Sequence, residues 1–249
     1  MGRTMSRLAG CLLAAAFACG AAWAQQPGQN TSATAPATAS SRDRNRAPGF
    51  DTRPMASRLV IVPADMELFS ISAGGVPEPK ADWTQAAQQH FKSALLARRS
   101  TLGENVQELA DKEMDDFAQL NALHGAVAES VFLHHVLGLK LPTKNDVLDW
   151  SLGDAVQPLQ ARTGADYALF FWIRDSYASA ERKAAMVAMA LFGVGIAGGS
   201  QIGYASLVDL RDGRVVWFNV LRRASGDLRE AKPAEETLEA LLKNFPAAK

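Results

Sequence analysis

One run of apolar and aromatic residues, Tyr167 to Ile173, does most to constrain how this chain can fold. It reads Tyr-Ala-Leu-Phe-Phe-Trp-Ile and has no polar residue at alternate positions. A strand with one face in water alternates apolar and polar side chains, whereas a strand covered on both faces does not. The run therefore predicts a central strand in a sheet that is packed on both faces.

The flanking segments predict the rest of the sheet and its helices. Apolar runs of strand length, bounded by Gly, Pro, Asn or Asp, lie on both sides of the central run. The strands that we expect are residues 58–63, 67–72, 105–109, 167–173, 203–210 and 214–219. The helices that we expect are residues 82–98, 112–137, 146–162 and 235–245. Because Asp212-Gly213 separates the last two strands, they should form a hairpin. The pattern predicts an α/β (α+β) fold: a mixed sheet with helices packed on it, a late β-hairpin, and an apolar Gly/Met-rich insertion.

The N-terminus has the three parts of a secretory signal peptide. Arg3 and Arg7 supply the basic part, residues 8–18 are apolar, and Ala22-Trp23-Ala24 offers small residues at a cleavage site. The apolar run is shorter than the roughly 20 residues that span a bilayer. We therefore expect residues 1–24 to be removed and the protein to be exported to the periplasm of the cell envelope.

Cleavage before Gln25 would remove Cys11 and Cys19, the only two cysteines. The mature protein would then have no disulfide and no thiol ligand. Cys19 is also the better placed of two weak lipidation sites, and lipidation there would associate the protein with the outer membrane. Residues 25–56 contain hardly any large apolar residue and predict a disordered linker, followed by a single α/β domain over residues 57–249.

Several function classes find little support. Lys plus Arg and Asp plus Glu both number 26, so no basic excess points to nucleic acid. Gly193–Gly198 matches G-x-G-x-x-G, but the residues after Gly198 are strand-like rather than helical, so we expect no nucleotide or other small-molecule cofactor. His134 and His135 are adjacent and would leave a helix in different directions, and with His124 they form no metal-binding spacing.

Four carboxylates surround the Gly/Pro-rich segment of residues 73–79: Asp65, Glu67, Glu78 and Asp82. Hydrolases use a pair of such groups as acid and base. Nothing in the sequence shows that two of them face each other, and solvated side chains with one helix cap, Asp82, account for them. A secreted hydrolase acting on envelope material stays open as an alternative, with no catalytic residue assigned.

The most unusual segment is residues 184–199, which contains only Ala, Met, Val, Leu, Phe, Ile and Gly. No charged residue lies between Lys183 and Asp209. The segment is too short to cross a bilayer. Three interpretations remain: a buried core helix, a surface for a partner or self-association, and membrane insertion. The residues that we expect at a partner or membrane contact are Met186, Met189, Leu191, Phe192, Val194 and Ile196.

Two stretches carry a resemblance to known domains. Residues 164–170 read Gly-Ala-Asp-Tyr-Ala-Leu-Phe, and residues 208–217 read Val-Asp-Leu-Arg-Asp-Gly-Arg-Val-Val-Trp. Together with the opening strand, residues 59–63, they resemble bacterial envelope α/β domains. These are the curli-secretion lipoprotein class, the N-terminal domain of TolB, and related lipoproteins of unknown role. The resemblance implies a non-enzymatic domain used for assembly or docking, and brings no catalytic residue.

The sequence thus favours an exported, non-catalytic envelope protein that docks an envelope protein or itself. A membrane surface is a further candidate contact, and a membrane-associated secretion or pore accessory is a second alternative to the docking role.

Overall fold

The computed structural model describes residues 44–224 and 226–249, which belong to one compact unit. The predicted signal peptide, and the predicted linker up to residue 43, lie outside the described residues. Residues 44–56, which the sequence assigns to the linker, pack against the domain. Ala47 and Arg53 are buried there, and Arg53 pairs with Ala248 in an isolated β-bridge.

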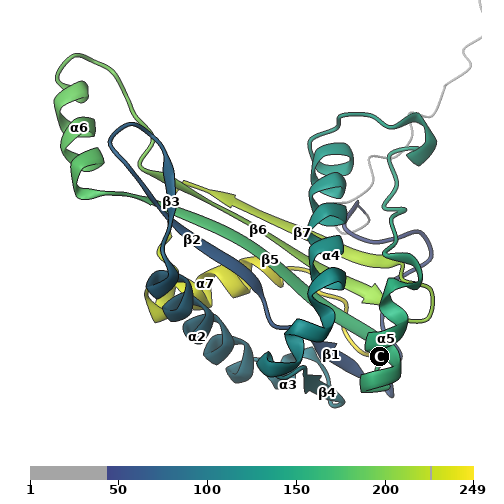
Figure 1. Ribbon diagram of the computed structural model, residues 1–249. Coiled ribbons are helices and arrows are strands. Elements are labelled where there is room, and N and C mark those ends of the chain that lie inside the picture. Colours follow the sequence, from purple (N-terminus) through teal and green to yellow (C-terminus); the bar gives the residue numbers. More distant parts are fainter. Residues whose placement is uncertain (1–43, 225) are drawn as a thin grey trace, which may run out of the picture. The chain divides into compact units, whose positions relative to one another are not determined.

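A mixed sheet forms the centre of this unit, as the sequence predicts, and it has seven strands rather than the six expected (Figure 1). Its middle strand is β5 (Tyr167–Ala178), which contains the continuous apolar run. One edge of β5 pairs in parallel with β1 (Leu59–Ile61) and, further along, with β2 (Asp65–Ile71). The other edge pairs antiparallel with β6 (Gly199–Asp209), which pairs with β7 (Val215–Arg223). The short strand β4 (Val106–Glu108) adds to β1.

Helices cover both faces of the sheet, which explains the apolar run. On one face, α2 (Ala81–Ala97) and α7 (Ala231–Leu241) pack on a core that includes Leu169, Phe171 and Trp217. On the other face, α4 (Ala118–Val131) and α5 (Gln157–Thr163) pack on Phe170 and Val208. Because successive side chains of β5 point to opposite faces, both cores draw on the same strand.

Four local predictions were wrong in detail. The segment of residues 77–79 is not a loop but an edge strand, β3 (Pro77–Pro79), paired with β2, where proline is tolerated. The helix α2 begins after Lys80 without a side-chain cap, so Asp82 does not cap it. The helix α7 starts earlier than expected and ends at Leu241. The expected helix of residues 112–137 is divided into three pieces: the 3-10 helix η1 (Asp111–Phe117), α4 and the π-helix η2 (Phe132–Val136).

A fifth difference concerns residues 146–162, of which only the second half is helical. After the short helix η3 (Pro142–Lys144), Asn145 and Asp146 adopt left-handed backbone angles that interrupt any helix. The chain then runs beside β7 and buries Leu148 and Leu152. These leucines have helical spacing, but they are buried by tertiary contacts of a non-helical segment. The helix resumes at η4 (Gly153–Val156), and Pro158 lies in the first turn of α5, where it costs nothing.

Candidate docking surface

The apolar insertion projects from the domain at the end of the β5–β6 hairpin (Figure 1). Its first part is α6 (Ala180–Ala190), a helix of 11 residues in which no residue is buried. We call residues 186–196 the apolar tip. Five side chains in it are exposed by 37–83%: Val187 67%, Met189 37%, Leu191 83%, Phe192 82% and Val194 44%. The interpretation of this segment as a buried core helix is therefore wrong.

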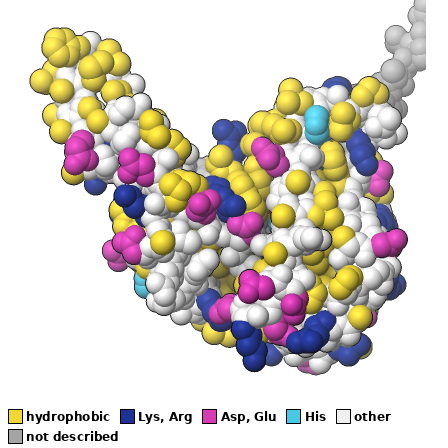
Figure 2. Space-filling view, in the orientation of Figure 1, with side chains coloured by type: hydrophobic (Ala, Val, Ile, Leu, Met, Phe, Trp, Pro, Cys, Tyr) yellow, Lys and Arg dark blue, Asp and Glu magenta, His cyan; other side chains and the backbone are white. Residues whose placement is uncertain are grey.

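The predicted contact residues divide into two groups. Met189, Leu191, Phe192 and Val194 are exposed, and Figure 2 shows hydrophobic side chains gathered over this end of the domain. Met186 and Ile196 are half-buried. Met186 turns inward and packs over Gly198. Val187 lies in the same uncharged run and is exposed, but it was not among the predicted contact residues.

Hydrogen bonds fix the tip to the rest of the domain, so it is not a free loop. The Ser179 side chain caps α6 by accepting a hydrogen bond from the Arg182 backbone amide. The Arg182 guanidinium donates from Nε to the Ala197 carbonyl at 3.0 Å and from Nη1 to the Ser72 carbonyl at 3.4 Å. Arg182 thus joins the start of α6, the end of the tip and the β2–β3 turn.

The end of α6 closes its own backbone hydrogen bonds. Gly193 has φ +75° and donates its amide to the Ala190 carbonyl at 3.0 Å, and Val194 donates to the Met189 carbonyl at 3.1 Å. This pair of bonds is the Schellman arrangement, in which a left-handed residue, usually glycine, ends a helix. The carbonyls paired in this way are those of Met189 and Ala190, at the end of α6.

A buried polar network lies beneath the tip, between β5, β6 and α7. Asp175 accepts hydrogen bonds from Tyr177 Oη and, at 2.6 Å, from Gln201 Nε2. Arg223 Nε donates to Gln201 Oε1 at 2.7 Å and its Nη2 donates to Thr237 Oγ1. Burial raises the pKa of Asp175 and also raises the pKa of Tyr177. Because each partner needs the others in place, the network holds the base of the hairpin in one register.

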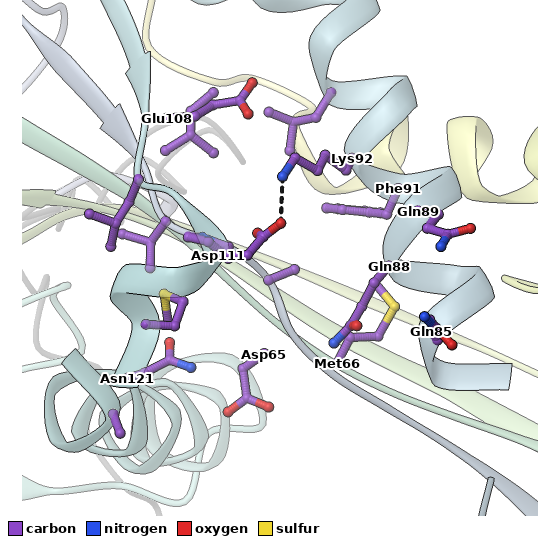
Figure 3. A pocket seen from close by; sticks show the side chains of 18 of the residues that line it. Asp65, Met66, Gln85, Gln88, Gln89, Phe91, Lys92, Glu108, Asp111 and Asn121 are labelled. Carbon is purple, nitrogen blue, oxygen red and sulfur yellow. Dashed lines mark hydrogen bonds and ion pairs between the residues drawn. The ribbon is translucent and has the colours of Figure 1, made fainter. Parts of the chain in front are cut away.

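A pocket of about 700 Å3 opens at the opposite part of the sheet, beyond the ends of β1 and β4 (Figure 3). It lies between α2, η1 and α4, with an apolar floor that includes Met66 and Phe91. In α/β sheets, binding crevices commonly lie outside the carboxyl ends of the parallel strands. Glu108 Oε1 and Asn121 Oδ1 are buried beside it without a hydrogen-bond partner among the described residues.

Two of the four carboxylates that line the pocket, Asp111 and Asp65, are paired with cations. Lys92 Nζ lies 2.7 Å from Asp111 Oδ2, and Arg174 Nη1 lies 2.7 Å from Asp65 Oδ1. Glu67, on the same face of β2, lies 3.6 Å from Arg174 Nε. The segment of residues 73–79, where the sequence placed a hydrolase site, does not line this pocket. The geometry thus offers a polar crevice with an apolar floor rather than a paired acid and base.

The three histidines considered as a metal site, His124, His134 and His135, each have a separate partner. His124 is fully buried, stacks on Phe170 with ring centroids 4.7 Å apart, and lies 2.9 Å from Ser206 Oγ through Nε2. Burial lowers the pKa of His124 to about 3. His134 and His135 contact backbone carbonyls of Leu139 and Arg44, each at 2.6 Å. Over residues 44–224 and 226–249, no group of His, Cys, Asp or Glu has the arrangement of a metal site. Within the same ranges no helix combines the length and the apolar character needed to cross a membrane.

Comparison with known proteins gives weak likenesses in structure only. No protein-family model and no curated protein matches the chain. The PelC dodecamer from Paraburkholderia phytofirmans is 12% identical, with 82% of this chain and 95% of that chain covered and a TM-score of 0.37. Lipoprotein GNA1162 from Neisseria meningitidis is 14% identical, with 76% and 94% covered and a TM-score of 0.29. The LpoB C-terminal domain from Salmonella enterica is 12% identical, with 71% and 87% covered and a TM-score of 0.27. Such scores assign neither a family nor a function.

Proposed function

We propose that this protein is an exported, non-catalytic component of the cell envelope that docks through its apolar tip. What it docks is another envelope component: a protein partner, a second copy of itself, or the membrane surface. The observation that carries the proposal is the exposure of Leu191 and Phe192, by 83% and 82%, at the end of a firmly mounted hairpin.

The energetic argument rests on the cost of keeping such side chains in water. Covering one large apolar side chain is worth roughly 1.5–3 kcal/mol. Single exposed apolar residues are ordinary on protein surfaces, but a contiguous group of them marks an interaction site. Here the group includes Val187, Met189, Leu191, Phe192 and Val194, and no charged residue interrupts the chain until Asp209.

The rigid mount supports the same function. Arg182 and the Schellman turn hold the tip in one conformation, so little conformational entropy remains to be lost when the tip is covered. A segment that served only as a connection between β5 and β6 would need neither its length nor this bracing, because two antiparallel strands can be joined by a two-residue turn.

Thiol labelling in cells tests this proposal whatever covers the tip. The full chain carrying Phe192→Cys is expressed and treated with a small thiol reagent in permeabilised cells, and again after purification. Lys232→Cys, at an exposed position of α7, is the matched control, and the unsubstituted chain gives the background.

We expect the thiol at position 192 to be protected in cells and labelled after purification, while the control thiol is labelled in both. Equal labelling of position 192 in both samples would show that nothing covers the tip, and the docking proposal would fail.

A further inference from the structure

A second exposed apolar group lies at the end of η2. We call it the rim patch: Val136, Leu137 and Leu139, exposed by 42%, 50% and 57%. It follows α4, which packs on the sheet, so its position is tied to the domain core. The sequence offered a signal for it, because Val-Leu-Gly-Leu continues the apolar character of α4 to the glycine that ends the helical segment.

In Figure 1 the rim patch and the apolar tip lie on the same side of the domain, at a distance from each other. In Figure 1, α6 and the end of α4 both reach the upper side, whereas α2 and α3 (Arg99–Leu102) lie below the sheet. Figure 2 shows hydrophobic side chains at the summit of both projections, separated by a hollow. The two groups can therefore meet one common surface.

The described chain begins beside the rim patch. The carbonyl of Arg44, the first described residue, lies 2.6 Å from Nε2 of His135, directly beside the rim patch. The preceding 43 residues contain the predicted signal peptide and the weak lipidation site at Cys19. The described chain thus enters the domain beside the rim patch.

The chemistry of both groups fits hydrocarbon better than a protein partner. From Ala184 to Gly198 no side chain can donate or accept a hydrogen bond through oxygen or nitrogen, whereas protein interfaces carry about one hydrogen bond per 100–200 Å2. The exposed side chains of the two groups number eight, against the roughly 20 residues a side of a stable protein interface.

Backbone pairing limits how deeply the two groups insert, because unpaired amides and carbonyls are costly in lipid. At the tip, the Schellman turn pairs the Met189 and Ala190 carbonyls, whereas the Leu191 and Phe192 carbonyls have no backbone partner among the described residues. At the rim patch, Leu137 donates to the Phe132 carbonyl at 2.8 Å and Leu139 donates to the Leu133 carbonyl at 3.1 Å. The Leu139 carbonyl in turn lies 2.6 Å from His134 Nδ1.

We propose that the apolar tip and the rim patch together insert into one leaflet of a phospholipid membrane. This inference rests on the proposed docking function and names its occupant. The 11 residues of α6 are about 16 Å long, which is about half of the roughly 30 Å hydrocarbon core, so the tip enters one leaflet without crossing. Lys140, next to the rim patch, has a side chain that is 78% exposed and lies 3.7 Å from Asp146 Oδ2, an exposed pair that lipid phosphates can replace.

Vesicle flotation of the exported chain tests the proposal. The vesicles are of phosphatidylcholine alone, or of phosphatidylethanolamine with phosphatidylglycerol. One variant carries Leu191→Asp and Phe192→Asp, and a second carries Leu137→Asp and Leu139→Asp. Leu96→Asp is the matched control, since Leu96 is 46% exposed on α2, away from the proposed membrane side.

We expect the wild-type chain and Leu96→Asp to float equally, and each double variant to lower the membrane partition coefficient by at least about tenfold, because burying one such side chain already contributes that factor. Both vesicle types should bind, with a modest preference for the anionic one. Circular dichroism confirms that each variant is folded.

A fluorescent readout avoids dependence on these variants. An environment-sensitive dye attached through Phe192→Cys or Leu137→Cys should brighten when vesicles are added, and a dye at Leu96→Cys should not. Absence of binding and of brightening at both positions would overturn the lipid proposal. If position 192 is nevertheless protected in cells, docking stands and its occupant is a protein. A dye at position 192 that brightens with protein concentration alone would identify a second copy as the occupant, and would also overturn the lipid proposal.

Discussion

Protonation of His124 should govern a large part of this domain's acid sensitivity. The imidazole is fully buried between α4 and the sheet, and burial lowers its pKa from 6.5 to about 3. Its Nε2 atom contacts Ser206 Oγ, while Nδ1 has no hydrogen-bond partner among the described residues, so the site holds the neutral ring. In the unfolded chain the same ring takes up a proton near pH 6.5.

The sign and size of the effect come from proton linkage. Between the two pKa values, the unfolded state binds one more proton than the folded state, so the free energy of unfolding falls as the pH falls. The contribution is fully present above pH 6.5 and is lost progressively toward pH 3. One pKa unit corresponds to about 1.4 kcal/mol, so acidification from neutral pH to about pH 4.5 should remove about 3 kcal/mol. That is a substantial part of the roughly 5–15 kcal/mol by which domains are stable.

The measurement is urea unfolding, followed by tryptophan fluorescence at both pH values, of the wild type, of His124→Gln and of the partly exposed control His90→Gln. His124→Gln should lower stability at neutral pH, because it loses the stacking on Phe170, yet lose about 3 kcal/mol less than the wild type on acidification. Other groups titrate equally in all three proteins and cancel in the comparison. An identical pH dependence in wild type and His124→Gln would refute the reasoning, since the ring would then not be held neutral by burial.

Two further predictions concern the mounting of the tip. Arg182→Ala removes the hydrogen bonds to Ala197 and Ser72, so amide exchange in the tip should accelerate while the free energy of unfolding changes by less than about 1.5 kcal/mol; unchanged exchange would mean that the arginine does not brace the tip. Gly199 has φ +152°, and a Cβ there would overlap the Ser176 carbonyl oxygen, so Gly199→Ala should lower the free energy of unfolding by at least about 2 kcal/mol in urea, and a neutral effect would contradict this packing.

The residue patterns that predict strands, helices and turns act over short stretches of chain, and they predicted most elements of this fold. The unbroken apolar run of β5 required cover on both faces, and the two cores on either side of it confirm that requirement. The Asp212-Gly213 turn was likewise recognisable, because Asp-Gly between two apolar runs favours a hairpin. In the structure Gly213 has φ +72° and the flanking strands pair. Errors arose where tertiary contacts outweighed the pattern. Leu148 and Leu152 have helical spacing, but they are buried by a non-helical segment that packs beside β7.

The candidate site divides in the same way. Composition alone singled out the apolar segment and four of its exposed residues, but left open whether it was core, partner surface or membrane contact. Hydrophobicity records how much a side chain gains from leaving water and not what covers it, so that question depends on elements distant in sequence. The pocket beyond β1 and β4 and the placement of the rim patch with the tip also involve such distant elements. The sequence by itself thus determined six of the seven strands, most helices and the uncharged segment. Only the tertiary structure decided that this segment stands exposed on a braced hairpin, because exposure is a property of the whole packed chain and not of any one stretch.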